Sequence, residues 1–427
     1  MAKKLRTVLI ISPHFPPSNL AAVHRSRLFA KHLPEFGWKP IILTVHEKYY
    51  EEALDQNLEK LVSSDLRIEK VKAMPITKPR LIGDIGLRAY FNLYRRAKKI
   101  IKNEKIDFLY IPIPSFYCAM LGRWLNKSTG IKYGIDYIDP WVHKFPGSDK
   151  KLSRHWWSSR FAIWAEPIAI KKASLITGVA EGYYDLVRKR NPHLLETCLF
   201  GALPYGGEIE DHEALQRLAL RPYLFQKNSK LQFLYAGAML PKAYDPLEAI
   251  FQSISDHREK FADVEFHFIG TGSSANDEFG YNIKELAEKY DLWNAIVFEY
   301  PKRIPYLDVL VHLNIADAIF ILGSTEPHYT PSKTYQAVLS KKPIIAVLHS
   351  ASTAVDVIRS TNAGMVLDFD GENGVRSINH DFPRFFERFL LFQRNFSPEL
   401  VDRSKFEQFS ARNLTKQLAA LFDKAAA

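Results

Sequence analysis

Short apolar runs alternate with longer stretches of mixed polarity along almost the whole chain. Each run is continuous, which is typical of parallel strands that are buried on both faces of a sheet. In the first half, the predicted strands are 8–12, 39–45, 66–72, 106–111, 132–138 and 175–179. In the second half, they are 231–236, 264–269, 295–298, 318–322, the run after Pro343, 354–360 and 364–367.

The stretches between these runs predict helices. They are one beginning near Leu20, then 47–62, 89–103, 153–172, 181–190, 245–258, 283–290, 306–315, 331–341, 382–394 and 398–423. Strands that alternate with helices form parallel sheets covered on both faces. At 427 residues the chain is too long for one ordinary core. The predicted fold class is therefore α/β, with two doubly wound parallel sheets.

Glycine and proline gather at 192–207, which is typical of a linker. The first domain is expected to span 1–200 and the second 208–395. A C-terminal helical segment is expected at 396–427.

The stretch 317–348 predicts strand, loop, helix and strand, and it holds the clearest candidate site. Thr330 is expected to cap the helix and Pro331 to be its first residue. Free backbone N–H groups at that end favour an anion, and Lys333 adds a full positive charge. Many α/β proteins have such a turn without a ligand. On these residues alone, a phosphate site and a plain turn are equal alternatives.

Composition narrows the expected partners. The net charge of +11 indicates nucleotide phosphates, nucleic acid or an acidic membrane face. The basic residues are dispersed and no nucleic-acid motif occurs, so nucleic acid is not an expected partner. Cys118 and Cys198 are the only cysteines, which indicates neither a disulfide framework nor a metal site. No apolar stretch is long enough to span a bilayer. A cytoplasmic protein without metal or cofactor is expected.

The loop after the first predicted strand, PHFPPSN, leads into a helix, as at the phosphate-facing corner of a Rossmann half-domain. Asn19 or Ser18 is expected to cap that helix, and Arg25 lies in its early turns. SNLAA occupies the place of the glycine fingerprint of dinucleotide-binding proteins, which disfavours a nicotinamide cofactor. His14 in this loop is one candidate for catalysis.

Asp139, Pro140 and Trp141 follow the predicted strand 132–138. A carboxylate at the carboxyl end of a parallel strand is a common place for chemistry, and an indole ring can line a sugar site. A turn-capping aspartate explains Asp139 equally well. His143, slightly further along, is an alternative proton acceptor.

Three tryptophans, Trp156, Trp157 and Trp164, lie among basic residues in the predicted helix 153–172. A basic, tryptophan-rich helix can lie on a membrane surface. It can also pack into the first domain. We favour packing because apolar residues fall all round the helix.

Five segments together resemble glycosyltransferase family 4. They are VLIISPHFPPSNLAAVHRSRLFAKHLPEFGWKPIILT, ASLITGVAEGY, LQFLYAGAM, FHFIGTG and ADAIFILGSTEPHYTPSKTYQAVLSKKPIIAV. Pro331, Ser332 and Lys333 match the Pro-Ser-Lys that one branch of the family carries at the head of its donor-site helix. The resemblance implies a GT-B fold, in which two Rossmann-like domains face a cleft and the last helix crosses back to the first domain. It also implies a retaining, metal-independent transferase that moves a sugar from a nucleotide to an acceptor hydroxyl.

The sequence departs from the family around this helix. The family usually has two glutamates with seven residues between them, where His328 and Gln336 stand here. Glu326 lies near the first position but out of register. Gln336 can still accept a hydrogen bond from the ribose hydroxyls through its side-chain oxygen. The family's catalytic histidine falls near Asp139.

A second departure concerns the phosphates. The family has an arginine after a strand-end glycine, whereas Ala238 follows Gly237 here, and Lys242 is the nearest replacement. Arg303 in YPKRIPY can add positive charge or be a solvated loop cation. Gly272 is expected to end a strand close to the nucleotide, or to be a plain turn glycine.

The expected catalytic residues are Asp139, His143 and His14. The expected donor-binding residues are Gly237, Lys242, Gly272, Arg303, Glu326, His328, Ser332, Lys333 and Gln336. The expected acceptor-side residues are Asn19, Arg25 and Trp141. The resemblance implies a UDP-, GDP-, dTDP- or CMP-sugar donor and a glycan or lipid-linked acceptor. Peripheral contact with the inner face of an anionic membrane is compatible with the charge.

The expected function is glycosyl transfer in cell-envelope polysaccharide or glycolipid synthesis. Two alternatives stay open. One is a GT-B enzyme resembling nucleotide-sugar 2-epimerases, which needs acid/base carboxylates and no acceptor site. The other is a degenerate, non-catalytic subunit that binds a nucleotide or glycan. The two missing glutamates support this second alternative.

Overall fold

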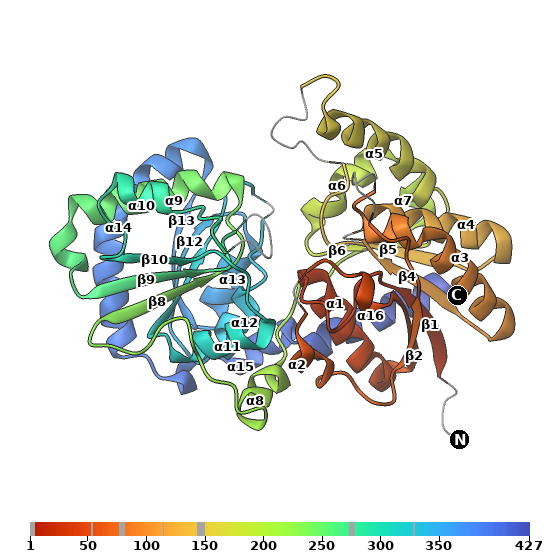
Figure 1. The fold of residues 1–427 in the computed structure, drawn as a ribbon, viewed down its shortest axis with the longest axis horizontal. Coiled ribbons are helices and arrows are strands. Elements are labelled where there is room, and N and C mark those ends of the chain that lie inside the picture. The colour runs from red at the N-terminus through yellow and green to blue at the C-terminus, as the bar shows by residue number, and fades with distance from the viewer. Residues whose placement is uncertain are drawn as a thin grey trace. The chain divides into compact units, whose positions relative to one another are not determined.

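A computed structural model describes residues 5–52, 54–76, 82–113, 115–142, 150–272, 278–327 and 329–427. The chain divides into two compact units (Figure 1). Unit 1 comprises Met1–Tyr205 and Ala411–Ala427, and unit 2 comprises Gly206–Ser410.

Unit 1 is built on a seven-stranded sheet in the order β3-β2-β1-β4-β5-β6-β7, with every neighbouring pair parallel. Its strands are β1 Arg6–Ile11, β2 Trp38–Val45, β3 Arg67–Val71, β4 Phe108–Pro112, β5 Tyr133–Tyr137, β6 Leu175–Gly178 and β7 Leu199–Ala202. The order reverses between β1 and β4. Ligands of open α/β sheets bind at the carboxyl ends of strands at such a reversal.

Helices cover both faces of this sheet. They are α1 Ala21–His32, α2 Gln56–Glu59, α3 Ile85–Asn103, α4 Ala119–Thr129, α5 Arg154–Ile170, α6 Glu181–Arg190, α7 Leu194–Thr197 and α16 Ala411–Ala426, with 3₁₀ turns at Leu33–Phe36, Glu47–Tyr49 and Phe116–Cys118. Helices α3 to α6 share one apolar core with the sheet. Helices α1 and α16 share the core on its other face.

The last helix, α16, returns to unit 1, as the sequence predicts. Phe422 places its ring 5.4 Å from that of Trp38 and 5.0 Å from that of Tyr110. Trp38 Nε1 also donates to Asp423 Oδ1 at 3.1 Å. Burial of an aromatic side chain from the far end of the sequence ties this helix to the sheet.

Unit 2 is built on a six-stranded sheet in the order β10-β9-β8-β11-β12-β13, again parallel throughout. The strands are β8 Leu231–Ala236, β9 Val264–Ile269, β10 Val297–Tyr300, β11 Ala318–Leu322, β12 Ile344–His349 and β13 Gly364–Phe369. The order reverses between β8 and β11, so the expected ligand position lies beyond the ends of these two strands.

The helices of unit 2 are α8 Ile209–Arg217, α9 Tyr244–Asp256, α10 Lys284–Lys289, α11 Tyr306–Ile315, α12 Thr334–Leu339, α13 Thr353–Ser360, α14 Gly371–Arg394 and α15 Arg403–Phe406. Its 3₁₀ turns are Pro241–Ala243, Arg258–Phe261, Pro398–Leu400 and Glu407–Phe409. Helices α9, α10 and α14 share a phenylalanine-rich core with one face of the sheet, and α11 and α12 lie on the other side in Figure 1.

Several predicted elements were wrong. The range 354–360 is helix α13 rather than a strand, because Ala354, Val355, Val357 and Ile358 are buried at helical spacing. The predicted helix 47–62 shrinks to a 3₁₀ turn and the four residues of α2, which Asp55 caps. The predicted helix 398–423 breaks into short turns, and α16 begins only at Ala411. Strand β7 lies inside the predicted linker.

No helix in the described part of the chain is long and apolar enough to span a lipid bilayer.

Candidate functional site

In unit 2, the loops after β8 and β11 contact each other where the strand order reverses. Lys242 lies in the 3₁₀ turn after β8, and Glu326 lies in the loop after β11. Lys242 Nζ and Glu326 Oε1 are 3.2 Å apart, and the Thr325 backbone N–H donates to the Lys242 carbonyl at 3.0 Å. Lys242 is more than half exposed, so its ammonium group is accessible to an anion beyond its carboxylate partner.

The loops after β9 and β10 also lie together. The Gly270 N–H donates to the Tyr300 carbonyl at 2.8 Å, and the Gly272 N–H donates to the Pro301 carbonyl at 2.9 Å. Gly270 has φ of 73°, which favours glycine. A Cβ atom at Gly270 would lie 3.7 Å from the Arg303 Cα, so the backbone turn passes close to Arg303. Gly272 itself is buried, and the strand ends before it, at Ile269.

Arg303 is the first of two incompletely compensated cations at this edge. Its side chain is half-buried, and its Nε is buried without a hydrogen-bond partner among the described residues. Burial lowers the pKa of Arg303 from its usual value. In the part of the chain that the structure describes, no carboxylate forms an ion pair with this guanidinium. A buried donor without an acceptor is costly, and an anionic ligand would supply one.

Lys333 is the second cation. Its Nζ lies 5.0 Å from the ring centroid of Tyr306, which is the first residue of α11 and follows Arg303 by three positions. Burial lowers the pKa of Lys333 to about 8. Among the described residues, no carboxylate forms an ion pair with it. Lys333 lies over the first residue of α11, and Arg303 precedes that residue by three positions, so two partly buried cations belong to this region of unit 2.

Helix α12 is shorter than expected. Lys333 is its N-cap residue, without a side-chain capping bond, and the helix begins at Thr334. Thr330 does not cap it, because its Oγ1 lies 2.8 Å from Thr353 Oγ1 instead. Ser332 is half-buried in the turn before the helix. Lys333 carries the charge at this position, because a six-residue helix contributes little dipole.

Gln336 is buried, and its Oε1 lies 3.0 Å from His212 Nε2. Burial lowers the pKa of His212, so the neutral imidazole donates from Nε2 to this oxygen. The oxygen expected to accept from the ribose is therefore already bonded within unit 2. The ribose contact stays a prediction, and His212 would have to release the oxygen. His328 and His143 lie outside the described residues.

In unit 1, a hydrogen-bonded group follows β1. His14 Nδ1 lies 2.9 Å from Glu52 Oε1, and Ser18 Oγ donates to the same oxygen. The rings of His14 and Tyr50 are 5.0 Å apart, and Tyr50 Oη accepts from the Phe15 N–H at 3.1 Å. Burial raises the pKa of Glu52, but the hydrogen bond and charge of His14 outweigh it and hold the pKa at about 2.

The sequence did not single out Glu52, which lay within the predicted helix 47–62, far from His14. The structure also corrects the expected cap of α1. The N-cap residue is Leu20, without a side-chain bond, and Ser18 turns to Glu52 instead. Asn19 is half-buried beside this group.

Arg25 is buried within unit 1 rather than directed to a ligand. Its Nε and Nη2 donate to the two carboxylate oxygens of Asp136, at 2.6 and 2.9 Å. Its Nη1 donates to the carbonyl oxygens of Leu203 and Pro204. Burial would lower the pKa of Arg25, but Asp136 raises it above the usual value. These contacts give Arg25 a structural role in unit 1, and its expected acceptor-side role stays a prediction.

The residues after β5 separate into an exposed and a buried group. Asp139 is exposed at the end of the strand. Trp141 is only 4% exposed. Its ring stacks on Phe116 with the centroids 6.0 Å apart and meets the ring of Tyr117 edge-on at 6.3 Å. Trp141 is therefore part of the core of unit 1, and its expected role as the wall of a sugar site stays a prediction.

Across the residues that the structure describes, no group of three or more histidine, cysteine, aspartate or glutamate side chains is arranged to hold a metal ion.

No protein-family model matches the sequence, and no curated protein matches it. Solved structures do resemble the fold. HepE from Anabaena, in complex with UDP and glucose, matches with a TM-score of 0.62 at 14% identity, covering 98% of this chain and 100% of that one. Sucrose-phosphate synthase from Thermosynechococcus elongatus matches with 0.61 at 12% identity, covering 98% of each chain. A trehalose 6-phosphate synthase from Burkholderia multivorans matches with 0.62 at 9% identity, covering 99% and 97%.

These likenesses extend over both units, and the identities are low, so they establish the fold alone. The chain has the GT-B fold of two Rossmann-like parallel-sheet units, as the sequence predicts.

Proposed function

We propose that this protein is a glycosyltransferase that moves a sugar from a nucleotide-sugar donor to an acceptor hydroxyl. The observation that supports this most directly is the pair of desolvated cations, Lys333 and Arg303, at the carboxyl edge of the unit 2 sheet. A diphosphate supplies the negative charge and the oxygen acceptors that both side chains lack. Lys242 follows the neighbouring strand β8, and its exposed ammonium group can still meet a phosphate although Glu326 lies beside it.

The positive charges of Lys333 and Arg303 would also assist the transfer reaction. Cleavage of the anomeric C–O bond leaves a diphosphate whose negative charge grows in the transition state. Fixed donors that meet such a charge are usually the largest catalytic term, about 2.7–4 kcal/mol for each donor that is removed. Desolvation strengthens their effect because the surrounding dielectric is low. Two protein cations can neutralise the leaving group without a metal ion, which supports a metal-independent reaction.

We assign hydroxyl handling to unit 1. Glu52 holds the imidazole of His14 through Nδ1. Nε2 then faces away from that carboxylate and can bond a hydroxyl of the acceptor or of the transferred sugar. Exposed Asp139 is the second candidate, as a carboxylate that would stabilise an oxocarbenium-like sugar carbon. The family 4 resemblance favours a retaining outcome.

The donor should be sought first among UDP-sugars, because HepE was solved with UDP and with UDP-glucose. The test is product analysis with UDP-, GDP-, dTDP- and CMP-sugars, with and without glycan or lipid-linked acceptors. We expect release of nucleoside diphosphate, or of CMP from a CMP-sugar, only when an acceptor is present. Epimerised nucleotide sugar without acceptor would indicate the 2-epimerase alternative. Binding without any product would indicate the non-catalytic subunit.

We further propose that α5 brings unit 1 to an anionic membrane surface, which suits a lipid-linked acceptor. Ala162 and Ala165 pack inward, whereas Trp157 and Trp164 are 58% and 60% exposed. Packing within the unit explains only the alanine face. The single carboxylate between residues 150 and 172, Glu166, is buried and paired with Arg190 at 2.5 Å. Exposed indoles on a helix with no exposed carboxylate fit the interface of an anionic bilayer.

A further inference from the structure

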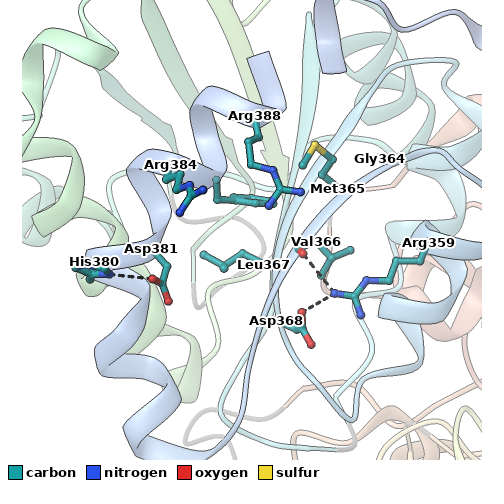
Figure 2. A pocket seen from close by; sticks show the side chains of 11 residues that line it. Arg359, Gly364, Met365, Val366, Leu367, Asp368, His380, Asp381, Arg384 and Arg388 are labelled. Atoms are coloured by element: carbon teal, nitrogen blue, oxygen red, sulfur yellow. Dashed lines mark hydrogen bonds and ion pairs between the residues drawn. The ribbon is translucent and has the colours of Figure 1, made fainter. Parts of the chain in front are cut away.

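A groove runs along the open edge of the unit 2 sheet, between strand β13 and helix α14, and we call it the β13 groove. It encloses about 720 Å³ and lies along strand β13, and neither Lys333 nor Arg303 lines it. Figure 2 shows residues of β13 between Arg384 and Arg388 on one side and Arg359 on the other. The groove plays no part in the proposed transfer reaction.

The strand offers unused backbone groups to the groove. β13 is an edge strand that pairs only with β12. The Ala363 and Phe369 carbonyls accept from Ile344 and Ser350 on the β12 side. The alternate residues, including Val366, therefore direct their N–H and C=O groups outward. Arg359 Nη2 approaches the Val366 carbonyl at 3.5 Å, which confirms its outward direction.

The position of the arginines on α14 follows from the apolar face that this helix turns to the core. Phe382, Phe385, Phe386 and Phe389 face inward at helical spacing. Arg384 and Arg388, which are exposed and one turn apart, are left on the groove side. Within the described ranges, neither forms an ion pair with a carboxylate. By contrast, Arg359 is paired with Asp368 at 2.5 Å, and His380 with Asp381 at 2.9 Å.

We propose that the β13 groove binds an extended acidic peptide segment of a partner protein, which adds to the sheet as a further strand. Such a segment would satisfy the outward backbone groups of β13. Its side chains alternate between the two faces of the sheet. Carboxylates at every second position would therefore meet Arg384 and Arg388 on the α14 side, and the intervening residues would lie toward Arg359.

Backbone and charge complementarity distinguish an acidic peptide strand from other possible occupants of the β13 groove. A free anion or a nucleic acid could meet the arginines, but neither has the alternating N–H and C=O groups that a strand edge pairs with. Pairing of β13 with β13 of a second copy would bring two sets of unpaired arginines together, and like charges disfavour that contact.

The test uses the full-length chain and a fluorescent eight-residue peptide of alternating threonine and glutamate, followed by anisotropy at low salt. Saturable binding is expected. Arg384→Glu with Arg388→Glu should weaken it at least about tenfold. Val366→Pro removes one outward N–H without breaking a bond to β12, and should weaken it similarly. Arg394→Glu, on the same helix but outside the groove, is the matched control and should bind like the parent.

Three results would overturn the proposal. One is the absence of saturable binding by the parent. Another is equal binding of a peptide that is N-methylated at alternate backbone nitrogens together with unchanged binding by Val366→Pro, which would reduce the groove to a surface that attracts anions. The third is self-association in sedimentation velocity that the two Arg→Glu changes abolish, which would make a second copy the occupant. Thermal unfolding of each variant, together with its nucleotide binding, checks that it has folded.

Discussion

Lys333 places its ammonium group over the face of Tyr306, 5.0 Å from the ring centroid. The ring holds the charge at the start of α11, three residues after Arg303 in the chain, and burial there lowers the pKa of the lysine. An aromatic face stabilises a cation without neutralising it. This arrangement keeps the positive charge available to a ligand, whereas a carboxylate partner would neutralise it.

The first prediction concerns pH. Burial lowers the pKa of Lys333 to about 8, so the free protein loses this charge as pH rises through that value. Nucleoside diphosphate affinity should therefore fall between about pH 7 and 9.5. Binding at about pH 8.5 should take up a proton, which calorimetry in buffers of different ionisation enthalpy detects. Lys333→Arg keeps its charge over this range and should flatten the profile. An identical pH profile in Lys333→Arg would remove Lys333 from the site.

The same shift has a consequence for folding. The unfolded chain keeps the proton on Lys333 up to its ordinary pKa, whereas the folded chain gives it up near pH 8. Between these values the unfolded state binds more protons, so this lysine makes the folded protein relatively more stable as pH rises. This contribution should be missing from Lys333→Met in urea unfolding across that window.

The second prediction concerns Glu52. Its pKa of about 2 lies below the ordinary value, so the folded state favours the carboxylate. The resulting stabilisation is present above about pH 4.5 and is lost as pH falls toward 2. Glu52→Gln should therefore be less stable than the parent at pH 7, and the difference should shrink at pH 3. If His14 handles a hydroxyl, Glu52→Gln should also lower turnover more than donor affinity. Glu59→Gln, an exposed change on α2, is the control.

The third prediction distinguishes a scaffold role for Arg25 from an acceptor role. Arg25→Met leaves Asp136 buried without its ion partner, and breaking such a pair costs about 3–5 kcal/mol. Urea unfolding should show this loss before any effect on acceptor KM. A variant that unfolds like the parent but has a raised acceptor KM would restore the acceptor-side assignment.

The fourth prediction concerns α5. The parent should co-sediment with anionic vesicles at low salt and less so at high salt, because the attraction is screened. Trp157→Ala with Trp164→Ala should reduce binding at least about fivefold without changing thermal stability, since both indoles are largely exposed. Trp38→Ala is no suitable control because that ring is buried. Phe91→Ala, an exposed apolar change on α3, serves instead. Equal binding by the double variant would leave α5 as a packing helix.

Parallel strands could be predicted from the sequence because their apolar runs are continuous, and both sheets follow from them. The prediction of individual elements failed where the spacing of apolar residues was ambiguous. The range 354–360 is rich in valine and isoleucine, which favour strands, yet its buried positions have helical spacing. The last helix begins later than predicted because turns interrupt the segment after Arg394.

The candidate site was partly predictable. Lys333 was expected at the head of a helix, and the structure gives it that position. That it lies over Tyr306 is a contact between residues 27 positions apart in the sequence, which no local pattern encodes. Arg25 and Trp141 were assigned to the acceptor side because their sequence positions are close to strand ends. Their burial depends on Asp136 and Phe116, residues far away in the sequence. Glu52 was missed for the same reason.

The central claim is that Lys333 and Arg303 hold the donor diphosphate, and calorimetric titration of UDP and uridine against matched variants tests it most directly. Lys302→Met is the control, since Lys302 neighbours Arg303 but is exposed and pairs with Glu278. Charge-assisted bonds are worth about 1.5–3 kcal/mol each, so the parent should bind UDP at least about a hundredfold more tightly than uridine. In Lys333→Met with Arg303→Met, that ratio should collapse toward one while uridine affinity is kept. A UDP-to-uridine ratio in the double variant equal to that of the parent and of Lys302→Met would contradict the claim.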